Sequence, residues 1–104
     1  MKTVKHIATG LVALGLLVAG NVQADQALAQ AKGCMACHQV ATKVVGPAYK
    51  DVAAKYKDQA DATAVLAAKV KAGGVGTWGQ IPMPPQPTLS DDEINTLVAW
   101  VLAQ

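Results

Sequence analysis

The 104-residue chain has no arginine and no phenylalanine, and it contains only two cysteines, two tryptophans and two tyrosines. Without arginine, and with its lysines dispersed, the chain offers no dense basic stripe for nucleic acid. A structural zinc site needs about four Cys or His ligands. Residues 25–104 offer only Cys34, Cys37 and His38. We therefore expect neither nucleic-acid binding nor a zinc-stabilised fold.

A long apolar run is also missing. Residues 7–20 carry no charge but span only about fourteen positions, short of the roughly 20 that cross a bilayer as a helix. Lys2 and Lys5 precede this run, and Val22-Gln23-Ala24 follows it with the modest side chains of a signal-peptidase site. The pattern predicts that residues 1–24 are a removed signal peptide rather than a stable membrane anchor. Residues 25–104 would then form one periplasmic domain.

The eighty residues 25–104 are few for a self-sufficient hydrophobic core. Domains of this size usually add a metal, disulfides or a cofactor. Seven lysines and seven acidic residues leave this part of the chain near neutral. Because Phe is absent, we expect a large, flat, apolar group to fill the centre.

Four helices are predicted, and no alternating run of β-branched residues indicates a strand. The first covers residues 26–33, and the third covers residues 61–72, where Gly73-Gly74 stops it. Helical spacing marks the inward positions of the second and third helices. These are Tyr49, Val52, Ala53 and Tyr56 in the second helix, and Leu66 and Val70 in the third. The expected fold class is all-α.

The fourth helix has the clearest pattern. Ser90 and Glu93 form a capping box at its start. An apolar stripe follows, made of Ile94, Leu97, Val98, Val101 and Leu102. Before it, residues 76–89 form a long loop, and a long loop in a small domain is usually functional.

Cys34-Met35-Ala36-Cys37-His38 is the strongest chemical signal in the sequence. At the Cys-x-x-Cys-His spacing, two thiols add to the two vinyl groups of haem while the imidazole reaches the iron. Residues three apart lie on one side of a helical turn, so both sulfurs can meet one edge of the ring. The motif predicts one covalent c-type haem with His38 as an iron ligand. A redox dithiol would need a strand–helix–strand context, and a simple disulfide would leave His38 unexplained.

Met83 is the candidate for the sixth iron ligand. Met35 lies inside the attachment loop, too close to reach the opposite face of the ring. Pro82 and Pro84 flank Met83 and hold it on a stiff loop. A His/Met pair raises the reduction potential. The alternative is that Met83 packs in the core, as methionines often do.

Four segments carry a family pattern: Gly33-Cys34-Met35-Ala36-Cys37-His38, Val45-Gly46-Pro47-Ala48, Gly76-Thr77-Trp78-Gly79-Gln80-Ile81-Pro82-Met83-Pro84-Pro85, and the capped C-terminal helix. With these segments, residues 25–104 resemble the bacterial cytochrome c-551/c-552 family. The resemblance implies a four-helix class I cytochrome c domain around one low-spin haem. It also implies electron delivery to nitrite reductases, terminal oxidases or cytochrome c peroxidases.

The resemblance further implies roles for four residues around the haem. The Pro47 carbonyl would accept a hydrogen bond from His38, and the Trp78 indole would donate one to a haem propionate. Lys69 falls where the family carries a cation near that propionate, and Gln86 where an amide contacts the ligand sulfur. Pro87 is an extra residue that bears on the placement of Gln86. Without the resemblance, Trp78 is a core residue and Lys69 a solvated charge.

With both axial positions filled by side chains, the iron has no open site, so we expect an electron carrier and not an enzyme. Its partners would be redox proteins, with a membrane cytochrome complex as donor. Four lysines are candidates for a positive rim at the docking surface: Lys32, Lys43, Lys69 and Lys71. We expect a monomer. The alternatives are a five-coordinate haem protein that binds a gas or reacts with peroxide, and a haem-free interaction module.

Overall fold

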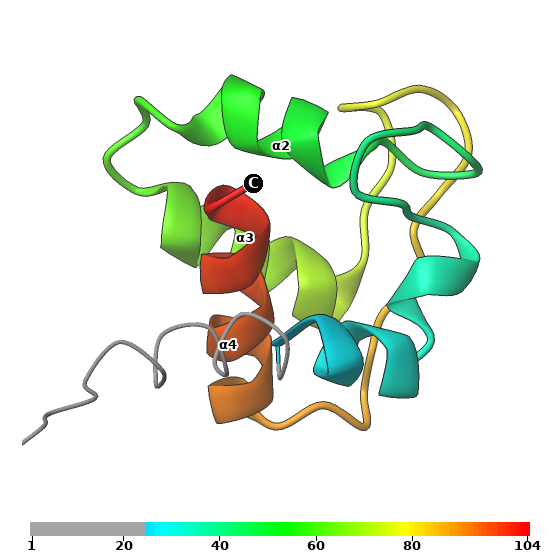
Figure 1. Cartoon of the computed structure of the whole chain (residues 1–104), viewed down its shortest axis with the longest axis vertical. Coiled ribbons are helices and arrows are strands. Elements are labelled where there is room, and N and C mark those ends of the chain that lie inside the picture. Colours follow the sequence, from blue (N-terminus) through cyan, green and yellow to red (C-terminus); the bar gives the residue numbers. More distant parts are fainter. Residues whose placement is uncertain (1–24) are drawn as a thin grey trace, which may run out of the picture.

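The computed structural model describes residues 25–104 (Figure 1). Residues 25–31 are helical, followed by the 3-10 turn η1 (Cys34–Ala36) and the helices α2 (Tyr49–Tyr56), α3 (Ala62–Ala72) and α4 (Asp91–Leu102). Within these residues the only β-pairing is two isolated bridges, so the predicted all-α fold is confirmed. The predicted signal peptide lies outside the described residues. Within residues 25–104, no helix has the length and apolar character needed to span a membrane.

The second and third helices form where the periodicity predicts. The buried residues of α2 are the four expected: Tyr49, Val52, Ala53 and Tyr56. Helix α3 ends at Gly73, whose φ of 77° lies in the left-handed region and whose N–H donates to the Lys69 carbonyl at 2.8 Å. Leu66 is buried and Val70 is half-buried, and both line a cavity.

Helix α4 lies against both α2 and α3 (Figure 1). Ile94, Leu97 and Val98 are buried as expected, but Val101 and Leu102 are only half-buried. The predicted stripe omits Trp100, which is 4 % exposed. Its indole meets the Tyr49 ring edge-on, with 5.2 Å between the ring centroids, so a contact with α2 accounts for its burial.

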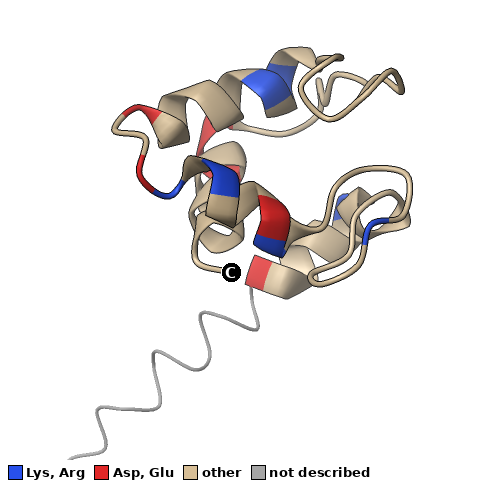
Figure 2. Cartoon of the chain, turned by 90° about the horizontal axis from the view of Figure 1, so that it is seen from above, with Lys and Arg blue, Asp and Glu red and all other residues tan. Residues whose placement is uncertain are grey.

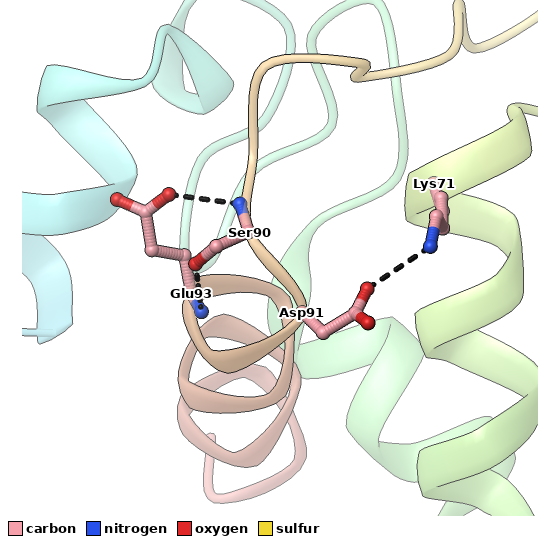
Figure 3. A network of polar contacts seen from close by, with 4 residues as sticks. All are labelled: Lys71, Ser90, Asp91 and Glu93. Atoms are coloured by element: carbon pink, nitrogen blue, oxygen red, sulfur yellow. Dashed lines mark hydrogen bonds and ion pairs between the residues drawn. The ribbon is translucent and has the colours of Figure 1, made fainter.

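The capping box at the start of α4 forms as predicted (Figure 3). The Glu93 N–H donates to Ser90 Oγ at 3.1 Å, and the Ser90 N–H donates to Glu93 Oε1 at 3.0 Å. Glu93 also pairs with Lys32 Nζ at 3.3 Å, and Asp91 pairs with Lys71 Nζ at 3.0 Å. These contacts tie the first turn of α4 to the end of the first helix and to α3.

The capping box gives one pH-dependent prediction. The Ser90 amide and the Lys32 ammonium hold the pKa of Glu93 below its ordinary value of 4.5. A carboxyl group whose pKa is lowered by folding stabilises the folded protein at pH values above its unfolded-state pKa. This stabilisation is lost as the pH falls through the folded-state pKa. We expect Glu93→Gln to melt below the parent near pH 7 and to approach it near pH 3.

The melting temperature would be measured by circular dichroism at both pH values. Glutamine keeps an acceptor oxygen for the capping box, so the variant tests the charge. Asp92→Asn removes a charge from the same turn and should change the melting temperature less. A deficit of equal size at both pH values would contradict the prediction.

Candidate functional site

A cavity of about 400 Å³ lies between η1, the three helices α2, α3 and α4, and the loop of residues 73–90. This volume falls within the range of about 300–1,000 Å³ typical of sites for small molecules and cofactors. Much of the wall is apolar and comes from Val52, Leu66, Val70, Leu97, Val98 and Val101. All eight site residues predicted from the sequence line it: Cys34, Cys37, His38, Pro47, Lys69, Trp78, Met83 and Gln86.

The His38 ring is held by one hydrogen bond. Its Nδ1 lies 2.8 Å from the carbonyl oxygen of Pro47. A carbonyl oxygen only accepts hydrogen bonds, so we assign the proton to Nδ1, which donates it to Pro47. Nε2 is then the unprotonated nitrogen that can bind a metal.

Gly46 approaches the same ring closely. A Cβ at this position would lie 2.5 Å from His38 Cε1 and 2.9 Å from Nδ1, distances that real side chains do not show. The Gly46 N–H also donates to the Cys37 carbonyl at 2.7 Å, which fixes the glycine against the attachment motif. The absence of a side chain at residue 46 therefore makes room for the imidazole.

We expect Gly46→Ala to displace the His38 imidazole and to lower the free energy of unfolding by about 1–3 kcal/mol, as overpacking does. Guanidinium unfolding of the haem-loaded protein would measure this. The matched control is Gly74→Ala, because a Cβ at residue 74 would meet no atom within 4 Å. Equal stability of the two variants would show that the close approach at Gly46 carries no constraint.

Tyr49 is a site residue that the sequence reasoning missed. Its ring stacks on the His38 ring, with centroids 4.9 Å apart and an interplanar angle of 19°. Its hydroxyl lies near the Cys34 thiol. Burial, and then the nearby Cys34 thiol, raise the pKa of the Tyr49 hydroxyl, so it stays protonated at neutral pH. The helical periodicity marks Tyr49 only as a core position.

Cys34 and Cys37 lie in and just after η1, and both are half-buried free thiols. Their sulfur atoms are the ones that would bind a cofactor covalently. Burial raises the pKa of the Cys34 thiol, and the nearby Tyr49 hydroxyl partly offsets this rise. The thiol is therefore neutral near pH 7.

Met83 lies in the loop and is tied to the end of α3. Its N–H donates to the Gly74 carbonyl at 2.8 Å, and its carbonyl accepts from the Gly74 N–H at 3.1 Å. A Cβ on Gly73 would lie 2.5 Å from the Met83 carbonyl oxygen, so the loop passes directly over this glycine. Met35, in contrast, packs against the hydrophobic core and does not line the cavity.

Trp78 and Lys69 both line the cavity. The Lys69 Nζ donates to Thr77 Oγ1 at 2.9 Å. Trp78 is 40 % exposed, and the Lys55 Nζ from α2 lies 5.8 Å from its ring centroid. This distance is within the range of a cation–π contact. The indole is thus at the open side of the cavity and not in the core.

Gln86 differs from the contact that the resemblance implies. Its side-chain amide donates to the Pro84 carbonyl at 3.2 Å, and its backbone N–H points to the Val70 and Lys71 carbonyls. A thioether sulfur is a weaker acceptor than a carbonyl oxygen, which explains the orientation seen here. The amide would have to turn to reach the Met83 sulfur.

The four lysines expected at a common rim are not brought together. Lys32 and Lys71 are engaged with acids of α4, and only Lys43 and Lys69 line the cavity. The loops of residues 39–48 and 73–90 carry a single charge, that of Lys43, and are almost entirely tan in Figure 2. Exposed apolar side chains occupy them instead: Val44, Val45, Val75 and Ile81.

The lining residues fit a covalently bound haem. Residues 25–104 hold no group of three or more His, Cys, Asp or Glu side chains placed for a metal ion. Apart from the two cysteine sulfurs, the side chains at the cavity that suit iron are one imidazole and one thioether, and they fit an iron whose other four ligands come from a macrocycle. The apolar walls suit its faces, and two cysteine sulfurs lie at one edge. The fold and this cavity define a small all-α haem protein of the c type.

Comparison with known proteins identifies the family. The chain matches the cytochrome c family over residues 22–104. It is 58 % identical over 90 residues to cytochrome c-552 of Nitrosomonas europaea, covering 86 % of this chain and 87 % of that protein. It is 54 % identical over 96 residues to cytochrome c-551 of Pseudomonas aeruginosa, covering 90 % and 91 %.

Solved structures of related proteins support the same family assignment. The crystal structure of wild-type Nitrosomonas europaea cytochrome c552 matches with a TM-score of 0.72 at 56 % identity, covering 74 % of this chain and 95 % of that one. A class 1 cytochrome from Sideroxydans lithotrophicus ES-1 matches with a TM-score of 0.64 at 34 % identity, covering 79 % and 94 %. The chain belongs to the bacterial cytochrome c-551/c-552 family. It is a small electron carrier with one covalent haem c.

Proposed function

We propose that this protein shuttles single electrons in the periplasm through a haem bound to Cys34 and Cys37, with His38 and Met83 as the axial iron ligands. One observation carries the proposal: His38 and Met83 line the same apolar cavity, and the His38 Nδ1 is occupied by Pro47. The nitrogen left free is Nε2, the one that iron needs.

Each residue has a defined task in this proposal. The bound haem supplies the one-electron ferric–ferrous couple, and a thioether ligand favours the ferrous state. Pro47 fixes the tautomer of His38, and Gly74 fixes the backbone of Met83. The apolar walls keep water away from the ligands. Both axial positions are filled by side chains, so the protein acts as a carrier and not as an enzyme.

The polar residues at the open side of the cavity would hold the charged end of the haem. We propose that the Trp78 indole N–H and the Lys69 ammonium bind a propionate. Both residues line the cavity, and Lys69 donates a hydrogen bond to Thr77, the residue before Trp78, which supports this assignment. For Gln86 we propose a contact with the Met83 sulfur once its amide turns away from Pro84.

The proposed docking surface is the pair of loops around the cavity. Ile81 is 68 % exposed and Val75 is 64 % exposed, which makes the surface apolar with Lys43 at its side. Weak redox encounters use small interfaces. We propose a membrane cytochrome complex as donor, and a nitrite reductase, oxidase or cytochrome c peroxidase as acceptor. Such contacts should depend only weakly on salt, because few charges lie at the surface.

The periplasmic location depends on the predicted removal of residues 1–24. We propose that export precedes haem attachment and that the mature protein is a monomer. The mass of the purified protein should equal that of residues 25–104 plus one haem. A mass that includes residues 1–24 would refute the predicted cleavage.

The visible spectrum tests the proposal directly. The protein would be produced in a cell that matures c-type haem and then purified. We expect low-spin bands and a thioether-to-iron charge-transfer band in the ferric state. High-spin bands would favour the five-coordinate ligand binder, and a missing Soret band would favour the haem-free module. Either result would overturn the electron-carrier assignment of these ligands.

A further inference from the structure

The first turn of α2 surrounds the His38 imidazole. Pro47, which accepts the Nδ1 hydrogen bond, comes two residues before Tyr49, whose ring stacks on the imidazole. The Tyr49 N–H donates to the Gln39 carbonyl at 2.9 Å, which anchors the helix start to the residue after His38. Backbone and side-chain contacts therefore fix the tyrosine relative to the imidazole.

A single hydrogen bond does not determine the plane of a ring. The Nδ1 contact with Pro47 sets the direction of one ring atom, but the imidazole can still tilt about the line of that bond. The Tyr49 ring, only 19° from parallel, removes this freedom. Tyr49 is itself held, because it is 6 % exposed and its ring also packs against the Trp100 ring, with 5.2 Å between the centroids.

The hydroxyl of Tyr49 lies near the attachment motif. Burial and the nearby Cys34 thiol, four residues before His38, raise the pKa of this hydroxyl. One side chain therefore lies beside both a covalent attachment point and the proposed iron ligand.

We propose that Tyr49 is a positioning residue whose ring sets the plane of the His38 imidazole. This inference rests on the proposed function, in which His38 binds iron. The plane of an axial imidazole determines how the iron d orbitals mix with the haem. The unpaired spin of low-spin ferric iron then falls unequally on the haem methyl groups. The NMR shifts of those methyl protons therefore report the plane together with the orientation of the thioether ligand on the other side of the haem.

The experiment compares three variants of the haem-loaded protein. Tyr49→Leu removes the ring and the hydroxyl, and Tyr49→Phe removes the hydroxyl alone. Tyr56→Leu is the control, because Tyr56 lies on the same face of α2, is 4 % exposed and does not line the cavity. The readouts are the pattern of haem methyl shifts, the reduction potential and the melting temperature.

We expect Tyr49→Leu to change the order or spread of the methyl shifts and to shift the potential, whereas Tyr49→Phe keeps the parent pattern. Tyr56→Leu should lower the melting temperature but keep the parent pattern and potential. If Tyr49→Leu behaved like the Tyr56 control, Tyr49 would be a core residue only. A changed pattern in Tyr49→Phe would contradict the role given to the ring.

The parent protein provides a measurement that needs no variant to fold. We expect nuclear Overhauser contacts from the Tyr49 ring protons to the protons of the His38 ring. Missing contacts would overturn the inference. If the parent lacked the thioether charge-transfer band, the proposed function would fail. If the band were present and the Tyr49 results negative, this inference alone would fail.

Discussion

Replacing Met83 by alanine should convert ferric iron wholly or partly to the high-spin state. Among residues 25–104, His38 and Met83 are the two candidate axial ligands that line the cavity. Removing the thioether leaves a position for water or an added ligand. Cyanide and imidazole should then bind far faster than to the parent. The reduction potential should fall, because the soft ligand that favoured ferrous iron is gone.

Absorption spectroscopy and stopped-flow mixing would measure both effects. Met35→Leu is the control, because Met35 packs against the core and does not line the cavity. We expect its spectrum and its ligand-binding rates to match those of the parent. Should Met83→Ala keep a low-spin spectrum with the sulfur charge-transfer band, Met83 would not be the ligand.

The second large effect concerns haem loss. We expect the double variant Cys34→Ala/Cys37→Ala to release its haem into acidified acetone, because no other cysteine can bind it. The haem-free chain should then lose most of its helix. A cavity of about 400 Å³ is large for so small a domain. At about 24 cal/mol per Å³, leaving it empty would cost on the order of 10 kcal/mol.

That cost is an upper value, since water enters through the open side, but it is comparable to the whole stability of a small domain. Far-ultraviolet circular dichroism of the haem-free chain should therefore show little helix and no cooperative melt. Native-like helix with a cooperative melt would argue against this dependence. Haem that stayed bound to the double variant in acidified acetone would refute thioether attachment.

Local pattern predicted the helices well. The burial of Tyr49, Val52, Ala53 and Tyr56 follows from their spacing alone, because one face of a helix is defined by position i and its neighbours three and four residues on. The burial of Trp100 could not be predicted in this way. It depends on the edge-on contact with Tyr49, which two separate helices create when they pack.

The residues of the candidate site could be predicted where they belong to a sequence motif with a known chemical role. Cys34, Cys37 and His38 belong to one short motif, and the flanking prolines single out Met83. The role of Tyr49 could not be predicted because helical spacing identifies the buried face of a helix but not which residues of that face lie beside a cavity. The two lysine–acid pairs were missed for a similar reason. Lys32 meets Glu93 only because the first helix packs near the start of α4.

The attachment of the Met83 backbone also bears on the speed of electron transfer. Both backbone hydrogen bonds of Met83 go to Gly74, and Pro82 and Pro84 have fixed φ angles on either side. A segment held in this way cannot follow a change of charge at its side chain by moving. If Met83 binds iron as proposed, the oxidised and reduced proteins share nearly one ligand geometry. The reorganisation energy is then small, and electron exchange between two copies of the protein should be rapid even without a driving force.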